Sequence, residues 1–401
     1  MIPLKKILLI SLFALVSIGM AFGIYFLFFR AEPEPPIIEK PEESVLPVTG
    51  LPDAEEASER PTEEELLPGV SSVARGGLTL VSSLTEARAI GASLSVDGKT
   101  INYYNRDDGK FYSLTSEGDT ITLSDKTFHQ VQNVTWSSDK NTAVLEYPDG
   151  SNIIYNFRTE TQTTLPKHWQ EFDFSPDDTQ IVAKSLSSDP TNNWLVAVDA
   201  DGANMQTVEL LGNNANKVHV NYSPNGQVVA FSHTGEAQGF SRQDIILIGM
   251  HGENFKALRV DGLGFHAKWS KTGDRLLYDV HNADSDYKPI LWISDASGEN
   301  IGTNKRNLGL NTWADKCAFA SERILYCAVP QTLSRGAGFQ PATADKIPDV
   351  FYRVDTSTGI KTMIASTSGD YTAENLMVSS DGQYLFFTEK QTGVIEKIQL
   401  R

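Results

Sequence analysis

A short pattern of apolar and polar positions recurs along the chain. In six of the seven copies an apolar or aromatic residue is followed by Ser, and in one by Ala; two turn-forming residues, Gly or a polar residue, and then an apolar run come next, as at 222–231. Pro presets the φ of a turn, Asn-Gly supplies positive φ, and β-branched and aromatic flanks favour strands, so each copy predicts a tight β-hairpin. The copies begin at Leu94, Trp136, Phe174, Tyr222, Trp269, Phe319 and Val378.

A third apolar run follows most copies, as at 195–199 and 291–295, and a further turn leads into a fourth β-rich run, as at 205–210. Four antiparallel strands in each repeat of roughly 40–50 residues are typical of one blade of a β-propeller. The sequence therefore predicts an all-β fold, a seven-bladed β-propeller, with six or eight blades as the alternatives. The acids inside the hairpin turns are predicted to be turn residues, and we assign no catalytic residue.

The hairpin copies and the trailing turns, such as Val-Asp-Ala-Asp-Gly at 198–202, resemble the WD40-like (PD40-type) repeats of TolB-like β-propellers. The resemblance covers roughly residues 75–401 and rests on turn and packing residues. It implies the fold. It implies function only weakly, because this chain lacks the separate N-terminal α/β domain of TolB and has seven copies where TolB has six blades.

The N-terminal segment differs from the rest in hydropathy. Lys5 and Lys6 precede 23 uncharged residues at 7–29, and Arg30 ends the run. That length spans a bilayer core of about 30 Å as a helix. The positive-inside rule leaves the N-terminus in the cytoplasm and the rest outside it. We expect residues 1–30 to be an uncleaved, single-pass anchor in the cytoplasmic membrane; a cleaved signal peptide is the alternative.

Residues 31–74 are acidic and rich in proline. Between 31 and 70, twelve Asp or Glu residues stand against Lys40 and Arg60, and eight prolines are spread among them. Such a composition buries too little apolar surface to order itself. We predict a disordered stalk, followed by the propeller at 75–401. The formal net charge of −17 argues against nucleic acid as a partner, because phosphate binding needs a basic surface.

Two local predictions concern the ends of the ring and the cysteines. The last repeat supplies only three strands before Arg401, so we expect the early strand at 78–81 to complete the seventh blade. Cys317 and Cys327 face each other if the turn of their hairpin centres on Ser321 and Glu322. They form either a cross-strand disulfide, which an extracytoplasmic location permits, or two packed thiols.

The predicted innermost strands carry polar residues at alternating positions, two and four residues before the Ser of each copy. Period 2 places them on one side of each strand, facing the central channel. Connections such as 185–193, 233–242, 281–288 and 331–348 are long and share one face, which favours a binding site there. The predicted binding residues at this channel mouth are Asn133, Glu171, Asp173, His219, Asn221, His266, Lys268, Lys316 and Asn375.

Four histidines belong to two neighbouring blades on the same face: His219, His266, His233 and His281. They form a candidate set of ligands for a divalent metal, and no other cofactor is expected. The resemblance to TolB-like propellers includes lyases that use a histidine-bound metal on this face.

We expect a binding or scaffold module for a protein, peptide or glycan of the cell envelope. The alternative is a metal-dependent polysaccharide lyase or hydrolase. The sequence contains no G-x-S-x-G elbow and no phosphate loop that would indicate other chemistry.

Overall fold

The computed structural model describes residues 15, 19–20, 69–237, 239 and 241–401. The chain divides into two units, Met1–Pro61 and Thr62–Arg401, and all the described strands belong to the second. The predicted stalk at 31–68 and almost all of the predicted anchor lie outside the described residues. No helix among those that the structure describes is long and apolar enough to cross a membrane.

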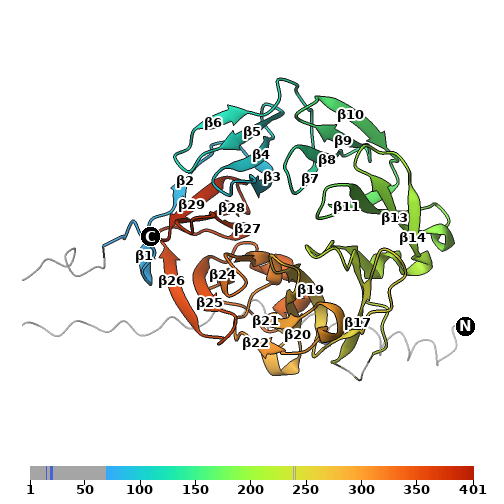
Figure 1. Cartoon of the computed structure of the whole chain (residues 1–401). Coiled ribbons are helices and arrows are strands. Elements are labelled where there is room, and N and C mark those ends of the chain that lie inside the picture. Colours follow the sequence, from blue (N-terminus) through green and yellow to red (C-terminus); the bar gives the residue numbers. More distant parts are fainter. Residues whose placement is uncertain (1–14, 16–18, 21–68, 238, 240) are drawn as a thin grey trace, which may run out of the picture. The chain divides into compact units, whose positions relative to one another are not determined.

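Seven β-sheets form a ring, which confirms the predicted seven-bladed β-propeller (Figure 1). Each blade is a four-stranded antiparallel unit. From the innermost strand outward, blades 1 to 3 are β3 (Ala89–Leu94), β4 (Ile101–Asn105), β5 (Lys110–Leu114) and β6 (Thr120–Thr122); β7 (Asn133–Trp136), β8 (Thr142–Glu146), β9 (Asn152–Asn156) and β10 (Thr161–Leu165); and β11 (Trp169–Phe174), β12 (Gln180–Ser185), β13 (Trp194–Asp199) and β14 (Gln206–Leu210).

The remaining blades continue the ring in chain order. Blades 4 to 7 are β15 (Val218–Val220), β16 (Ala230–Ser232), β17 (Gln243–Ile248) and β18 (Leu258–Val260); β19 (Leu263–Trp269), β20 (Arg275–His281), β21 (Ile290–Asp295) and β22 (Arg306–Asn307); β23 (Cys317–Phe319), β24 (Ile324–Pro330), β25 (Asp349–Asp355) and β26 (Lys361–Thr367); and β27 (Ala373–Val378), β28 (Tyr384–Glu389), β29 (Ile395–Gln399) and β2 (Ser82–Ser83).

The connections hold short 3-10 helices of three to six residues. They are η2 (Pro190–Asn192), η3 (Gly212–Lys217), η4 (Ala283–Ser285), η5 (Gly298–Asn300), η6 (Ala314–Lys316), η7 (Ala337–Phe339) and η8 (Pro341–Ala344). Except for η5, all lie in connections from blade to blade or from second to third strand. We call the face that these connections share the long-loop face. The predicted long connection at 331–348 carries both η7 and η8.

The repeated hairpins join the two inner strands of the blades, as the pattern predicted. In five of them the Ser hydroxyl donates to the Asp or Asn two residues later, at 2.5–2.7 Å. These hydroxyls hold the pKa values of Asp97, Asp177 and Asp381 below their usual range. The turn acids are therefore ionised acceptors that fix the hairpins, a structural role.

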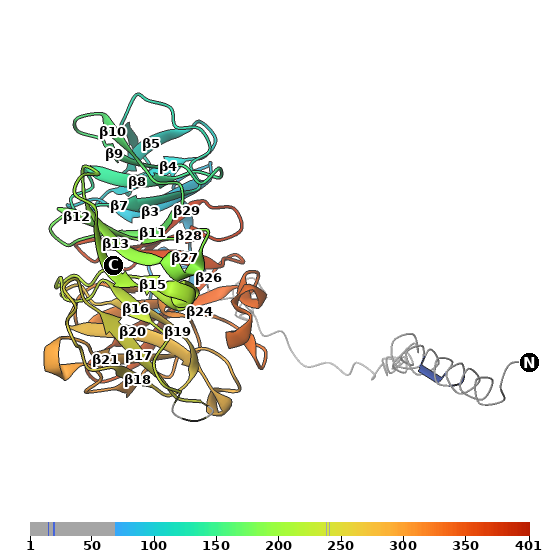
Figure 2. The same cartoon turned by 90° about the vertical axis from the view of Figure 1, so that its right-hand side faces the viewer.

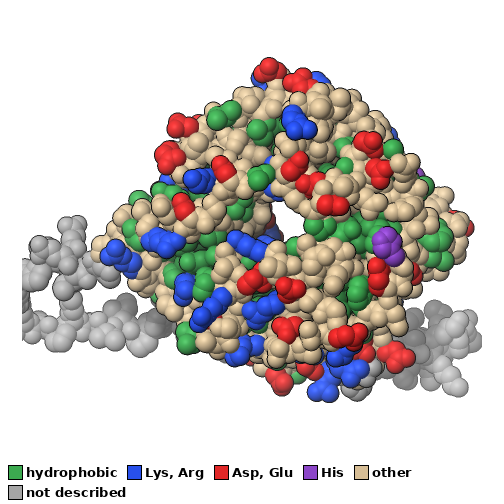
Figure 3. Space-filling view, in the orientation of Figure 1, with side chains coloured by type: hydrophobic (Ala, Val, Ile, Leu, Met, Phe, Trp, Pro, Cys, Tyr) green, Lys and Arg blue, Asp and Glu red, His purple; other side chains and the backbone are tan. Residues whose placement is uncertain are grey.

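Apolar side chains fill the spaces between neighbouring blades. Between blades 1 and 2, for example, Phe111 meets Trp136 and Phe157 with ring centroids 5.6 and 4.9 Å apart. The core includes several fully buried aromatic residues, among them Tyr104, Tyr155 and Phe351. This packing leaves polar side chains to line the ring's centre, where charged groups of both signs surround an opening (Figure 3).

The closure of the ring corrects one prediction. The segment expected to complete blade 7 forms β1 (Gly77–Thr79) instead, which adds a fifth, parallel strand to blade 6 by pairing with β26. The next two residues, Ser82 and Ser83, form β2 and pair with β29 of blade 7. The expected strand therefore lies one blade away from its predicted place. The reason is that the chain pairs first with the outer edge of blade 6 and then with the outer edge of blade 7. Counting the strands that blade 7 lacks cannot tell which of the two short strands completes it.

The two cysteines lie in the inner hairpin of blade 6. Cys317 of β23 is directly opposite Cys327 of β24 in the strand register, and the two form a disulfide with their Cα atoms 4.1 Å apart. Of the two alternatives that the sequence left open, the structure has the cross-strand bond. It links two adjacent strands near the centre of the ring.

Candidate functional site

Several of the nine polar residues predicted at the channel mouth bind a neighbouring blade. The carboxylate of Asp173 accepts the Tyr222 amide proton at 2.7 Å, the Asn221 amide donates to the Ala267 carbonyl at 3.2 Å, and Lys268 donates to the Cys317 carbonyl at 2.7 Å. Asn375 completes the pattern by donating to the carbonyl of Ala92 at 2.5 Å. We call these four the cross-blade set, because each joins one inner strand to the next around the ring.

Burial shifts the pKa values of the charged members of this set. Desolvation raises the pKa of Asp173 to about 6, against the opposing effect of the amides of Tyr222 and Phe174. Desolvation also lowers the pKa of Lys268. Groups held in this way are costly to release for a ligand, so the cross-blade set is better explained by ring assembly than by binding.

Glu171 and Asn375 show that the inner strands are not regular. Both residues have positive φ, +55° and +48°, and the register of β11 and of β27 shifts at these points. A β-bulge re-aims side chains, so simple alternation does not hold here. Glu171 pairs with buried Lys184 and also accepts the amide proton of Val220 in blade 4 at 3.3 Å, and Asp173 on the same strand likewise binds blade 4. Asn133 pairs with Glu146 at 2.5 Å.

Two predicted residues, His266 and Lys316, line a cavity of about 170 Å³ on the long-loop face, between blades 5, 6 and 7. We call it the mouth cavity. Its wall comes from the connection into blade 6 (Trp313, Asp315, Lys316), from the long insertion (Pro341, Ala344, Asp345) and from blade 7 (Thr372, Ala373, Glu374, Lys390). Blade 5 contributes His266, so three blades and one insertion build the cavity.

Two ion pairs fix the floor and rim of the mouth cavity. Lys316 and Asp349 are both buried, and the ammonium lies 2.7 Å from one carboxylate oxygen. Asp349 also accepts the Ala373 amide proton at 2.7 Å, and burial raises its pKa. At the rim, Lys390 lies 2.8 Å from Asp345 of the insertion. The insertion is thereby tied to both the floor and the rim.

His266 is backed by a buried carboxylate. Its Nδ1 lies 3.3 Å from Asp279, while 55% of the imidazole side chain is exposed. The hydrogen bond to Asp279 raises the pKa of His266, and desolvation raises the pKa of Asp279 to about 6. Asp279 also accepts the amide proton of Ala314 at 2.8 Å. This arrangement orients the imidazole toward the cavity, where it can donate or accept a proton.

Of the remaining candidate histidines, His219 and His233 belong to blade 4, and His281 belongs to blade 5. His219 packs edge-to-face on His233, with ring centroids 5.4 Å apart, and lies 3.8 Å from Glu171. Burial lowers the pKa values of both, that of His233 to about 4. His281 is buried against the ring of Phe339 in the insertion, with centroids 4.4 Å apart.

The four histidines predicted as metal ligands therefore do not form one cluster. Among the described residues, no three His, Cys, Asp or Glu side chains form a group that could hold a metal ion. The physical reason is that each histidine has found a separate partner: His266 binds Asp279, His219 stacks on His233, and His281 packs under the insertion. A metal at the mouth stays a prediction, which elemental analysis tests.

Sequence reasoning missed Asp279, Asp349, Trp313, Glu374 and Lys390. One signal was available for Asp279, because a lone acid inside the apolar run at 276–280 requires a partner once the strand is buried. For the other four the pattern gives no signal. Their meeting depends on which connections fold over which blades.

No protein-family model matches the chain, and a search of curated proteins found no match either. Solved structures do match. An oligogalacturonate lyase in complex with manganese is similar with a TM-score of 0.60 and 15% identity, over 80% of this chain and 93% of that one. An oligogalacturonate lyase from Vibrio parahaemolyticus gives 0.58 and 12% over the same shares.

A third structure, the β-propeller domain of Myceliophteria thermophila Cps50 (Swd1), gives a TM-score of 0.51 and 10% identity, over 80% of this chain and 100% of that one. At these identities the likeness shows the fold alone. The protein is thus a seven-bladed β-propeller similar in fold to WD40-like propellers, as its repeats predicted.

Proposed function

We propose that the protein is a membrane-anchored binding module, held outside the cytoplasm, whose mouth cavity engages a protein, peptide or glycan of the cell envelope. The observation that carries the proposal is the mouth cavity itself, built by three blades and the long insertion on one face. Asp345 of the insertion and Asp349, which directly follows it, bind lysines of the cavity wall, and loops held in this way on a rigid scaffold commonly form binding sites.

The charges of the cavity indicate what its ligand carries. Lys316 and Lys390 are neutralised by their aspartates. Asp315 and Glu374 have no ion-pair partner among the residues that the structure describes, and burial raises the pKa of Glu374. Trp313 adds an apolar wall. A ligand with an amine or several hydroxyl groups and one apolar face fits this lining, as an amino sugar or a basic peptide would.

The test is binding of two probe sets, isolated cell-wall glycan fragments and basic peptides, to the full chain in mild detergent. Glu374→Ala should weaken binding of the preferred probe by about tenfold, since it removes a charge-assisted contact. Glu160→Ala, an exposed acid on blade 2, is the matched control. Equal affinities of the parent and the Glu374→Ala variant for every probe would contradict the proposal.

The location is a separate part of the proposal. It rests on the uncharged run at 7–29 and on the acidic, proline-rich segment after it. Alkaline carbonate should leave the chain in the membrane fraction, and protease added to intact spheroplasts should degrade the propeller. Release by carbonate, or protection until lysis, would count against it.

A second candidate function is a metal-dependent polysaccharide lyase or hydrolase. It is supported by the fold likeness to oligogalacturonate lyases and by the oriented imidazole of His266. The residues present do not fit the metal, because no three ligands come together among the described residues. Elemental analysis of the full chain, beside its His219→Ala/His266→Ala variant, decides: stoichiometric metal lost in the variant favours the enzyme, and absence of metal removes it.

A further inference from the structure

Blade 4 is paired differently from the other blades. Its third strand, β17, pairs with β16 only through Ile246–Ile248 and with β18 only through Gln243–Ile245. Within these two ladders no residue of β17 pairs on both sides, and only Gln243 gains a second partner, by an isolated bridge to Ala237. By contrast, Trp194–Ala197 of β13 in blade 3 pair with β12 and β14 together. The fourth strand, β18, begins only at Leu258, and residues 251–257 before it have no strand structure.

The half of β17 without an outer neighbour presents main-chain groups. The Ile248 carbonyl accepts the Val229 amide proton at 2.8 Å, so Ile248 faces β16. Successive residues of a strand direct their amide and carbonyl groups to opposite edges, so those of Leu247 face outward. The ladder to β18 ends at Ile245, and no other described main-chain group bonds to Leu247. An unpaired edge of this kind is a template for another strand.

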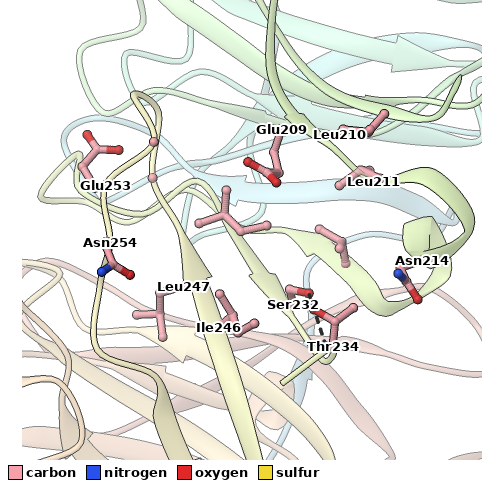
Figure 4. Close-up of a pocket in the computed structure, with 14 residues that line it drawn as sticks. Glu209, Leu210, Leu211, Asn214, Ser232, Thr234, Ile246, Leu247, Glu253 and Asn254 are labelled. Carbon is pink, nitrogen blue, oxygen red and sulfur yellow. Dashed lines mark hydrogen bonds between the residues drawn. The ribbon is translucent and has the colours of Figure 1, made fainter. Parts of the chain in front are cut away.

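Blades 3 and 4 lie next to each other in the ring, where β12 and β15 are in contact (Figure 2). A cavity of about 300 Å³ lies at their junction, beside this edge (Figure 4). Leu210 of β14 forms one wall and Ile246 of β17 the other, and these side chains are 52% and 38% exposed. Figure 4 shows both strands bordering the space. Exposed branched side chains beside free main-chain groups suit an extended segment that pairs through its backbone and inserts alternate apolar side chains.

The charged residues that line this cavity are all acidic. Glu209 and Glu253 stand at the rim, and none of the lining residues is Lys or Arg. One oxygen of Glu253 accepts the amide proton of His251 at 2.8 Å. The carboxylate of Glu209 has no such bond among the described residues and points toward the space in Figure 4. The complement to this rim is a basic residue.

We propose that the outer edge of β17 binds an extended peptide segment of another protein as an added strand. A branched apolar side chain of the segment enters the cavity between Leu210 and Ile246, and a Lys or Arg faces Glu209. This site is distinct from the mouth cavity, which lies between blades 5, 6 and 7. Its occupancy does not depend on the function proposed for that cavity.

The test is selection of phage-displayed random heptapeptides on the full chain in mild detergent. The enriched sequences should alternate branched apolar and polar residues and contain Lys or Arg. A synthetic copy should bind the Ile246→Asp variant at least about tenfold more weakly, and the Glu209→Lys variant about two- to fivefold more weakly. Ile121→Asp, at a 64% exposed position on the outer strand of blade 1, is the matched control and should bind as the parent does.

Backbone pairing has its own readout. N-methylation of the peptide amide that faces Leu247 should abolish binding, whereas methylation of the next amide should not. No enrichment, or equal binding to the parent and to both groove variants, would overturn the proposal. So would tolerance of every N-methyl group. Sedimentation of the parent as a dimer that Ile246→Asp dissociates would make a second copy the occupant and also overturn it.

Discussion

The inner strands of this propeller carry two kinds of polar residue that look alike in the sequence. The cross-blade set, with Asp173 and Lys268 as its charged members, holds each blade to the next. Two other residues at the mouth, half-buried Glu374 and exposed His219, make no side-chain hydrogen bond to a buried group among the described residues. Polarity near a channel therefore does not by itself indicate binding. What separates the two kinds is whether a side chain already has a buried partner.

The largest expected effect on stability concerns the buried ion pair at the floor of the mouth cavity. Asp349→Ala should lower the free energy of unfolding by about 3–5 kcal/mol, because it leaves the buried ammonium of Lys316 without a counter-charge. Urea unfolding at pH 7 measures the loss. The control is Asp345→Ala, whose half-exposed pair with Lys390 should contribute about 0–1 kcal/mol. Equal losses would show that floor and rim do not differ.

The disulfide provides the next test, on the inner hairpin of blade 6. Cys317→Ala/Cys327→Ala should lower the free energy of unfolding by about 2–3 kcal/mol, because the bond closes a short loop in the unfolded chain. Reductant added to the parent during unfolding should produce the same loss, and it should leave the variant unchanged. A loss in the variant that reductant does not reproduce would point to packing instead.

His266 combines the two properties, because it has a buried partner and also lines the mouth cavity. Because it partners buried Asp279 and also lines the cavity, His266→Ala should cost about 1–3 kcal/mol of unfolding free energy and should weaken ligand binding too. His266→Gln retains a donor for Asp279, so it should recover part of the stability without restoring the imidazole. Thermal unfolding of the two variants compares them. Identical losses would mean that the bond to Asp279 contributes nothing.

The repeats were sufficient to predict the fold, because turn chemistry and β-branched flanks are local properties. The same local logic placed Cys317 opposite Cys327. It failed where the answer depends on long-range neighbours. Period 2 could not foresee the bulges at Glu171 and Asn375, and a count of strands misassigned β1. The mouth cavity needed the path of the insertion at 331–348, which no pattern encodes.

Asp173 gives a smaller effect with a definite sign. Its pKa is about 6 in the fold and 3.8 in the reference state, so the folded protein binds the proton more tightly. Protonated Asp173 therefore contributes to the free energy of unfolding below pH 4, and this contribution is lost as the pH rises through 6. From pH 4 to 7 the parent should therefore lose on the order of 1 kcal/mol relative to Asp173→Asn, which cannot ionise. Parallel pH profiles would contradict the assignment.

The smallest expected effect on stability is that of replacing His219, which has no buried partner. His219 is 55% exposed, and its contact with Glu171, at 3.8 Å, is longer than a hydrogen bond. His219→Ala should therefore change the free energy of unfolding by no more than about 0.5 kcal/mol. His219 and His266 precede the Ser position of their repeats by the same four residues, so only their partners distinguish them. Equal losses of unfolding free energy in His219→Ala and His266→Ala would mean that position on the inner strand matters more than a buried partner. The distinction between residues with and without a buried partner would then fail.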